Sequence, residues 1–251
     1  MLYVMKLVSI ITPTFNNAST IKDCLNSIYS QTYSNIEHII IDNCSSDGTL
    51  DIIQKHPFEK RKIISEKDKS LYDAINKGIK IASGDIIGIL HADDFYIHQN
   101  VIEKVQSHFQ RELQGVYANL YYVDKKNTNK ILRKWKAGNY TLSSFLYGWM
   151  PPHPTCFVTK DVYEKFGNYR LDMGTAADYE WILRVMYKHK IKFDYLDDYI
   201  IAMRTGGVSN QSILNRIKAN INDRKAWEVN QLKPYFFTLY FKPLRKLTQF
   251  I

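Results

Sequence analysis

The fold is indicated first by the stretch Ile86-Ile87-Gly88-Ile89-Leu90-His91-Ala92-Asp93-Asp94, in which an apolar run ends in two adjacent carboxylates. An apolar run of this length is typical of a buried strand in a parallel sheet. Open α/β sheets bind their ligands at the carboxyl ends of such strands. Two carboxylates there predict a site for a metal ion and a diphosphate, although adjacent Asp residues also favour a simple Asx turn before Phe95.

Apolar runs and helical segments alternate up to about residue 100. We predict further strands at residues 6–12, 36–41 and 62–65, and helices around residues 21–28, 49–56 and 72–79. This alternation indicates a parallel sheet with right-handed crossovers. We therefore expect an α/β fold with a mostly parallel, Rossmann-like central sheet flanked by helices.

The pattern changes beyond residue 100. There we predict a helix at residues 100–110, a β-hairpin formed by residues 115–123 and 130–135, a short strand at 155–159 and a helix at 179–187. We expect this smaller half to pack on the far edge of the sheet rather than to form an independent domain. Residues 211–251 are predicted to form a helical tail rich in basic and aromatic residues.

The composition is that of a globular unit with a sizeable core, since the chain has 251 residues and 45% hydrophobic content. Its three cysteines, an odd number without metal-ligand spacing, predict buried apolar side chains in a reducing, cytoplasmic compartment. Lys6 interrupts the apolar N-terminal run and no cleavage site precedes Pro13, so we expect no signal peptide. No run approaches the roughly 20 apolar residues of a membrane-spanning helix.

The formal charge of +9 suits a nucleic acid, an anionic membrane surface or a phosphorylated substrate. Aromatic residues make up 14% of the chain, but they are spread along it and do not alternate with Lys and Arg in one segment. This distribution argues against a base-stacking platform, and we expect no nucleic-acid partner.

Four carboxylates lie at or just after predicted strand ends, namely Asp42, Asp68, Asp93 and Asp94. A parallel sheet places such positions along one edge. A single Asp after a strand is usually the cap of the next helix, but four at successive strand ends argue against four independent caps. The sequence thus predicts an edge suited to a charged ligand.

Three stretches resemble the family 2 glycosyltransferases of the GT-A fold. They are Val8–Asn16 (VSIITPTFN), Ile40–Thr49 (IIDNCSSDGT) and Ser65–Gly78 (SEKDKSLYDAINKG). The resemblance is close over residues 6 to about 95 and looser through 153–184 and 206–209, where the chain is similar to the bacterial branch that builds surface polysaccharides. It implies a GT-A domain at 1–210, with a nucleotide-sugar-binding half at 6–98 and an acceptor-side half at 99–210, followed by the tail at 211–251.

The resemblance also implies which residues bind the donor. Thr12 and Pro13 would form the loop beside the nucleotide. Asp42 would bind the base or the ribose, Asp68 the base from the other side, and Asp93 the ribose.

In the same way, the resemblance implies that Asp94 binds a divalent cation bridging the two phosphates of the donor. The cation is needed because a nucleoside-diphosphate leaving group accumulates negative charge. Oxygen ligation suits Mg²⁺ or Mn²⁺. His91 stands where many relatives have Asn or Asp, which does not weaken the metal assignment.

An inverting transfer needs a base that takes the proton from the acceptor hydroxyl. The candidate is Asp178 in Ala176–Trp181 (AADYEW), which resembles the family's acidic element at a helix start. That position stabilises the ionised carboxylate. Asp178 could instead be only an N-cap, and Glu180, on a different helical face, is the alternative base.

Three further residues are candidates for contacts with the acceptor or the diphosphate, namely His153, Trp181 and Arg204. His153 lies in a Pro-rich turn and could instead be a hydrogen-bonding spacer. Trp181 is either a floor for the sugar ring or part of the core. Arg204 and residues 205–209 are expected to form a mobile loop that closes on the diphosphate.

Residues 233–251 contain four basic residues and no acid, interleaved with aromatic and aliphatic side chains. Such a segment favours peripheral contact with a membrane, with roughly 1 kcal/mol of attraction per basic residue near an anionic surface. It could instead pack on the body of the protein or on a second subunit, as in a homodimer. Pro234 and Pro243 are expected to break any single long helix.

Together these features predict a metal-dependent, inverting glycosyltransferase. It would move a hexose or N-acetylhexosamine from a nucleotide-diphosphate sugar, with UDP expected, to a lipid-linked or growing surface glycan at the cytoplasmic membrane face. Two alternatives stay open. A nucleotidyltransferase that makes the nucleotide-sugar would need a Gly-rich basic loop, but residues 12–16 contain neither Gly nor Lys. A non-catalytic glycan- or nucleic-acid-binding module would not need the carboxylates described above.

Overall fold

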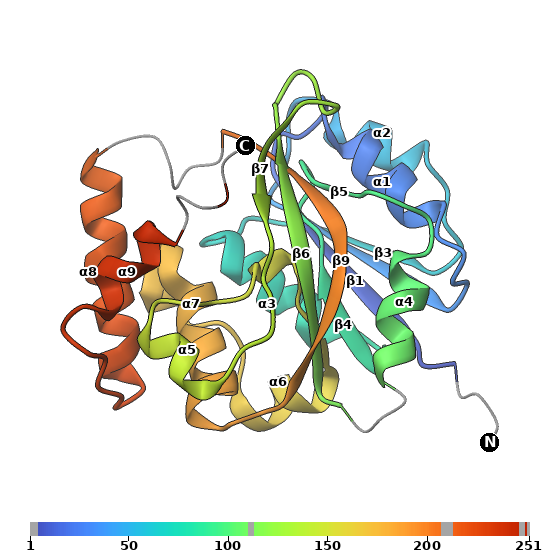
Figure 1. Ribbon diagram of the computed structural model, residues 1–251. Helices are drawn as coiled ribbons and strands as arrows, with labels where there is room; N and C mark the ends of the chain where they lie inside the picture. The colour runs from blue at the N-terminus through green and yellow to red at the C-terminus, as the bar shows by residue number, and fades with distance from the viewer. Residues whose placement is uncertain (1–4, 110–112, 207–212, 246–248, 250–251) are drawn as a thin grey trace.

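The computed structural model describes residues 5–109, 113–206, 213–245 and 249. In this part of the chain, nine strands form one sheet in the order β3-β2-β1-β4-β8-β6-β9-β5, with β7 paired to β6 (Figure 1). The strands are β1 (Val8–Thr14), β2 (Ile36–Asp42), β3 (Arg61–Ser65), β4 (Ile86–Ile89), β5 (Phe95–Tyr96), β6 (Gly115–Val123), β7 (Ile131–Trp135), β8 (Phe157–Thr159) and β9 (Phe193–Arg204). The helices are α1 (Ile21–Tyr29), α2 (Thr49–Gln54), α3 (Leu71–Ile81), α4 (Val101–His108), α5 (Leu142–Leu146), α6 (Lys160–Phe166), α7 (Ala177–Ile182), α8 (Ile213–Val229) and α9 (Thr238–Leu244).

The first half of the sheet is parallel, as the sequence predicts. Strands β3, β2, β1 and β4 pair in parallel, and β1 and β2 are buried along their whole length. The register pairs Thr14 with Asp42 and Asp42 with Ser65. The carboxyl ends of these strands therefore lie at one edge.

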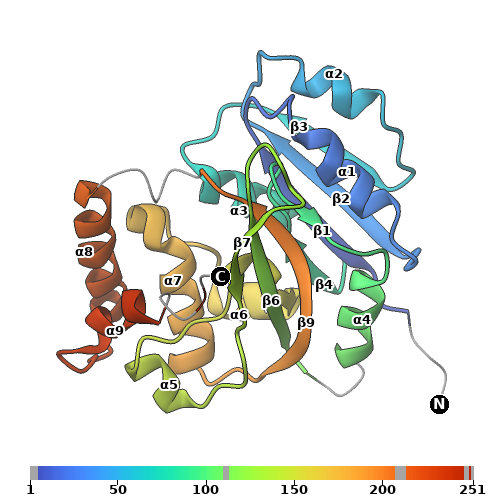
Figure 2. The ribbon, with the colours of Figure 1, turned by 45° about the horizontal axis from the view of Figure 1, so that its top comes forward.

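Successive residues of β1 face two different hydrophobic cores. Ile11 packs in the core that α3, α6 and α7 share, whereas Ile10 packs in the core that α1, α2 and α4 share. Figure 2 shows α1 and α3 on opposite sides of these strands. Gly78 of α3 lies so close to β1 that a Cβ atom there would be 2.5 Å from Cγ2 of Ile11. This close packing holds α3 against the sheet.

The second half extends the same sheet but is mixed in direction. Strand β8 is antiparallel to β4 and to β6, β6 is parallel to β9, and β5 is antiparallel to β9. The prediction of a mostly parallel sheet thus holds for the first half only. The predicted hairpin is confirmed as β6 and β7.

Strand β9 was not predicted, because its sequence lacks a period of two and carries three Asp residues. All three have partners on neighbouring segments: Asp194 lies 2.6 Å from Nδ1 of His108, Asp198 lies 2.6 Å from Nζ of Lys104, and Asp197 accepts a hydrogen bond from Nδ2 of Asn119 at 3.1 Å. The pairing of β9 with β6 shifts register between Ala118 and Leu120. Tertiary pairing, rather than local pattern, makes this segment a strand.

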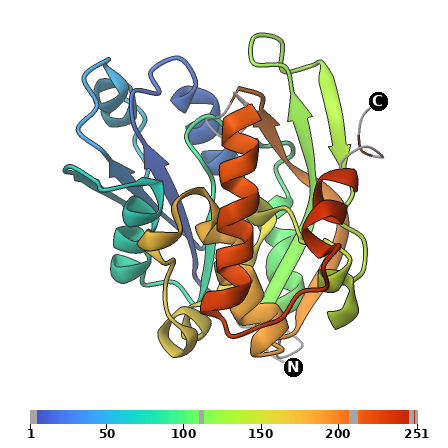
Figure 3. The same cartoon turned by 90° about the vertical axis from the view of Figure 1, so that its left-hand side faces the viewer.

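Helices α8 and α9 form an outer layer over α7 and the end of α5 (Figures 1 and 3). Pro234 lies between them, as expected, whereas Pro243 lies inside α9 near its end and does not break it. The predicted domain boundary at residue 210 falls outside the described residues. Within the described residues, no helix has both the length and the apolar character needed to cross a bilayer.

Candidate functional site

Buried polar atoms without a hydrogen-bond partner gather at the carboxyl ends of β2, β3 and β4. Among the described side chains the atoms of this kind are Asp42 Oδ1, Asp68 Oδ2, His91 Nε2, Asp94 Oδ2, Tyr96 Oη and His98 Nδ1. The first four belong to residues that follow or end these three strands. Buried polar atoms are almost always hydrogen-bonded. Four unpartnered atoms at one sheet edge indicate the place of a polar ligand.

Asp42 and Asp68 each have one oxygen bound and the other available. Oδ2 of Asp42 accepts hydrogen bonds from the Ser45 amide (3.0 Å) and from Oγ of Ser65 (2.6 Å). Oδ1 of Asp68 accepts a hydrogen bond from Nζ of Lys77 (2.7 Å). The backbone amide of Asp68 donates to Oδ1 of Asn43 (2.7 Å), which ties the two loops together. Both carboxylates are thus oriented by the protein and keep a free oxygen for a ligand.

His91, Asp93 and Asp94 form a group that can hold a metal ion, because their ligand atoms lie within 4.8 Å of one another. Asp94 is almost fully buried, and its Oδ1 accepts the backbone amide of Arg204 at 3.1 Å. Burial, together with the charge of Asp93, raises the pKa of Asp94 well above its usual range. Such a carboxylate is stabilised by a nearby cation.

Asp178 is brought to this group by the packing of α7. It is the second residue of the helix and does not cap it, because the N-cap is Ala176 and Oδ1 of Asp178 accepts the amide of the next residue, Tyr179, at 2.7 Å. Burial raises the pKa of Asp178, against the lowering effects of Lys242 and the Tyr72 hydroxyl. Burial lowers the pKa of His91, and the negative charges of Asp93 and Asp178 act against this lowering. A carboxylate with a raised pKa therefore lies beside the candidate metal group.

Thr12 and Pro13 are placed differently from the predicted loop. Both belong to β1, and the fully buried hydroxyl of Thr12 pairs with Nε2 of His38 at 2.9 Å. The loop begins after Thr14, and Asn16 in it has a positive φ of 52°. The Thr12 side chain thus faces the core under α1, because alternate residues of a strand point to opposite faces.

Arg204 is the last residue of β9 and not part of a loop, which corrects the prediction. Its side chain is 6% exposed, pairs with Asp23 of α1, and donates to the backbone oxygen of Asp93. Its guanidinium also lies 5.1 Å from the ring centre of Phe95. A shallow hollow of about 440 Å³ lies beside Arg204, and its lining includes Asp23 of α1 and Lys125 but none of the residues with unpartnered atoms. The predicted loop at 207–209 lies outside the described residues.

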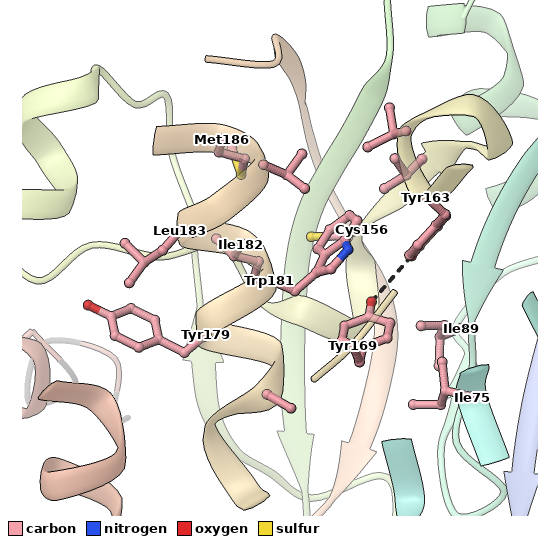
Figure 4. Packing of buried hydrophobic residues seen from close by; sticks show 14 of the residues in the cluster. Ile75, Ile89, Cys156, Tyr163, Tyr169, Tyr179, Trp181, Ile182, Leu183 and Met186 are labelled. Carbon is pink, nitrogen blue, oxygen red and sulfur yellow. Dashed lines mark hydrogen bonds between the residues drawn. The ribbon is translucent and has the colours of Figure 1, made fainter. Parts of the chain in front are cut away.

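Trp181 is fully buried, so its ring has no face for a sugar and belongs to the core (Figure 4). It stacks on Tyr163, and its indole N–H donates to the Gly167 carbonyl at 3.1 Å. His153 is also buried, with Nε2 2.7 Å from the Tyr169 hydroxyl. Burial lowers the pKa of His153 to about 3, which makes the ring a neutral hydrogen-bonding group.

Glu180, the alternative base, is bound to Arg184. Both of its oxygens lie 3.0 Å from guanidinium nitrogens of Arg184, and the side chain is 1% exposed. The amide of Asn230 in the segment after α8 donates to the same carboxylate at 3.2 Å. These contacts leave Glu180 a structural role.

Two tyrosines near the carboxylates had not been singled out from the sequence. Tyr72 lies in the first turn of α3 and its hydroxyl interacts with Asp178. Burial raises the pKa of Tyr122 in β6, and the charges of Asp94 and Asp178 raise it further. The guanidinium of Arg133 lies 4.5 Å from the centre of the Tyr122 ring. Tyr72 lies inside the resembling stretch Ser65–Gly78, which is a usable signal, but nothing in the local pattern distinguishes Tyr122 from a strand residue.

Curated relatives of this chain are glycosyltransferases. It is 32% identical over 179 residues to the uncharacterized glycosyltransferase Rv1514c of Mycobacterium tuberculosis, covering 70% of this chain and 68% of that protein. It is 37% identical over 124 residues to the UDP-Glc:alpha-D-GlcNAc-diphosphoundecaprenol beta-1,3-glucosyltransferase WfaP of Escherichia coli, covering 48% of each.

Solved structures with the same fold include S. aureus TarS (residues 1–349) in complex with UDP-GlcNAc, with a TM-score of 0.70 and 16% identity over 94% of this chain and 69% of that one. Another is the mannosyltransferase PcManGT from Pyrobaculum calidifontis in complex with GDP-Man and Mn²⁺, with a TM-score of 0.66 and 18% identity over 95% of this chain and 69% of that one. These similarities confirm the GT-A fold. The family model described as glycosyl transferase family 2 matches residues 9–167, well over half of the chain. The protein therefore belongs to the family 2 glycosyltransferases.

Proposed function

We propose that this enzyme transfers a hexose or N-acetylhexosamine from a UDP-sugar to a lipid-linked or growing surface-polysaccharide acceptor, with inversion at the anomeric carbon. The observation that carries the proposal is the set of unpartnered oxygens of Asp42, Asp68 and Asp94 at one sheet edge, beside the ligand group of His91, Asp93 and Asp94. In this proposal the general base, Asp178, lies next to the diphosphate site. The relatives support the donor and acceptor classes, since TarS was solved with UDP-GlcNAc and WfaP is named for UDP-Glc and a diphosphoundecaprenol acceptor.

The free oxygens of Asp42 and Asp68 would bind the nucleoside. Each carboxylate is oriented by its other oxygen, so it can accept hydrogen bonds from a base or ribose without rearranging. Such preorganisation lowers the entropy cost of binding. The side chain of Thr12 has no part in this role because it is buried against His38.

The residues at the end of β4 fit a divalent cation. Asp94 offers Oδ2, since Oδ1 is bound to the Arg204 amide, and Asp93 and His91 offer further ligand atoms within 4.8 Å. Carboxylate oxygens suit Mg²⁺ or Mn²⁺, and an added imidazole favours Mn²⁺. PcManGT was solved with Mn²⁺. A bound cation would neutralise charge on the departing diphosphate.

Asp178 would take the proton from the acceptor hydroxyl as that oxygen attacks the anomeric carbon. A base works best when its pKa lies close to the working pH, and burial moves the pKa of Asp178 upward. The hydroxyl of Tyr72 interacts with this carboxylate and would hold it in place. His153 would not contact the substrate and would serve as a neutral hydrogen-bonding partner of the Tyr169 hydroxyl.

The test is a donor screen on the purified full chain with Mn²⁺. We expect one UDP-sugar to raise the melting temperature of the protein and to release UDP when acceptor is supplied. NMR of the product should show that the anomeric configuration is inverted relative to the donor. If the protein instead releases pyrophosphate when it is given UTP and a sugar phosphate, that activity would support the nucleotidyltransferase alternative. If no nucleotide-sugar stabilises the protein or is turned over, the proposal fails.

A further inference from the structure

Exposed aromatic rings gather on α9 and on the segment before it. The ring of Phe237 contacts its neighbours at centre-to-centre distances of 5.8 Å to Tyr147, 5.2 Å to Tyr235, 5.2 Å to Phe236 and 5.0 Å to Phe241. With Tyr240 and Leu244, which are 63% and 52% exposed, these residues make up what we call the aromatic face. Phe236 is 86% exposed. Contiguous exposed apolar surface of this kind marks an interaction site.

The opposite side of α9 is anchored to the body of the protein. Leu239 is buried, and the Thr238 hydroxyl donates to the Leu146 carbonyl at 2.6 Å. Nζ of Lys242 pairs with Asp223 of α8 at 2.7 Å. The backbone of Lys242 lies so close to Gly148 that a Cβ there would be 2.5 Å from its amide nitrogen. The aromatic face is therefore held outward by a packed helix, as Figure 3 shows for α9 against its neighbours.

The segment that carries the aromatic face is basic in sequence, and one of its basic residues, Lys242, is paired with Asp223. Residues 233–251 carry four basic residues and no acid, and Lys233 in this segment is exposed. The whole chain has a formal charge of +9. Aromatic rings beside basic residues are the composition that binds the headgroup region of an anionic bilayer.

The inner side of α9, opposite the aromatic face, contacts the residue that follows the candidate base. The ammonium of Lys242 is 3.5 Å from the ring centre of Tyr179, the residue that follows Asp178. The same helix thus presents its inner side to the start of α7 and its outer side to solvent. An acceptor held at a surface in contact with α9 would be near Asp178.

We propose that the aromatic face docks on an anionic lipid bilayer and so presents the site to a membrane-anchored acceptor. The docking itself does not depend on the proposed function, and only the identity of the acceptor does. A second copy of the chain is the competing occupant of this surface.

The test is co-sedimentation of the full chain, without donor, with vesicles of phosphatidylcholine alone or with about 30% phosphatidylglycerol. We expect binding to the anionic vesicles only. The double variant Phe236→Ser, Tyr240→Ser should weaken it at least about tenfold, because two exposed rings no longer leave water on docking. Lys233→Gln should weaken it by up to about fivefold.

Met5→Ser is the control, because Met5 is 48% exposed and lies beside the start of β2, where its carbonyl accepts a hydrogen bond from Asn35. It should bind like the wild type. The proposal is overturned if the wild type ignores anionic vesicles, or if the double variant binds as well as the wild type. It is also overturned if the wild type is a dimer that the double variant dissociates and neither form binds vesicles. Docking without donor turnover would support this inference while contradicting the proposed function.

Discussion

The guanidinium of Arg204 at the end of β9 pairs with Asp23 of α1, 181 positions earlier in the chain. The same side chain donates to the backbone oxygen of Asp93, and its own amide binds Asp94. Arg204 thus joins α1, β9 and the end of β4 at the candidate metal group. Through these contacts Arg204 holds Asp93 and Asp94 in place.

Asp23→Ala should therefore weaken metal binding as well as stability. The substitution leaves a buried guanidinium without its carboxylate partner, which costs about 1–3 kcal/mol. We expect a lower melting temperature and a several-fold weaker Mn²⁺ affinity by electron paramagnetic resonance. Asp51→Asn, an exposed acid in the first turn of α2, is the control. Unchanged Mn²⁺ affinity in Asp23→Ala would show that the pairing does not position Asp93 and Asp94.

Asp178→Asn should keep donor binding and lose transfer. The amide has the same shape but cannot accept a proton, so the rate should fall by about 10²–10⁴-fold. The measurements are the donor dissociation constant by calorimetry and the initial rate of UDP release with acceptor. Equal loss of donor binding would mean that Asp178 holds the donor instead of acting as the base.

The rate of transfer should rise with pH as Asp178 ionises, with a midpoint above the usual Asp range, since burial raises the pKa of this carboxyl. The positive charge of Lys242 lowers that pKa, so Lys242→Gln should move the acid limb of the pH–rate profile to higher pH. Because the folded state holds this proton more tightly than the unfolded chain, ionising Asp178 costs stability as pH rises through the same range.

The control for that shift is Asp223→Asn, which breaks the ion pair that holds Lys242 but leaves its charge. If Asp223→Asn moves the acid limb as far as Lys242→Gln does, a displaced α9 and not the charge of Lys242 is the cause. Asp178→Asn should abolish the limb altogether.

His91→Ala should weaken Mn²⁺ binding at least about tenfold, because it removes one of the ligand atoms grouped with Asp93 and Asp94. The expected readout is calorimetric titration of Mn²⁺ in the presence of UDP. His98→Ala, whose imidazole pairs with Asp198 away from the group, should bind Mn²⁺ like the wild type. Equal affinity in both variants would remove His91 from the site.

Much of the first half could be predicted from the sequence alone. The strands β1, β2 and β4 are mostly apolar without a period of two because both of their faces are buried, and this pattern is local. The chain direction of a parallel sheet then places Asp42, Asp68, Asp93 and Asp94 at one edge. The unpartnered oxygens of three of these residues lie where this rule puts them.

The tertiary structure alone decided which side chains face that edge and which face the core. Trp181 and Glu180 follow Asp178 within three positions, yet they are buried against Tyr163 and Arg184. Strand β9 and Arg204 acquire their places from pairing with β6 and Asp23, more than seventy positions away. Local pattern sets the type of the elements in the first half, because periodicity acts over a few residues, whereas β9 becomes a strand through its pairing with β6. Burial and ion pairing depend on segments that meet only after the chain has folded.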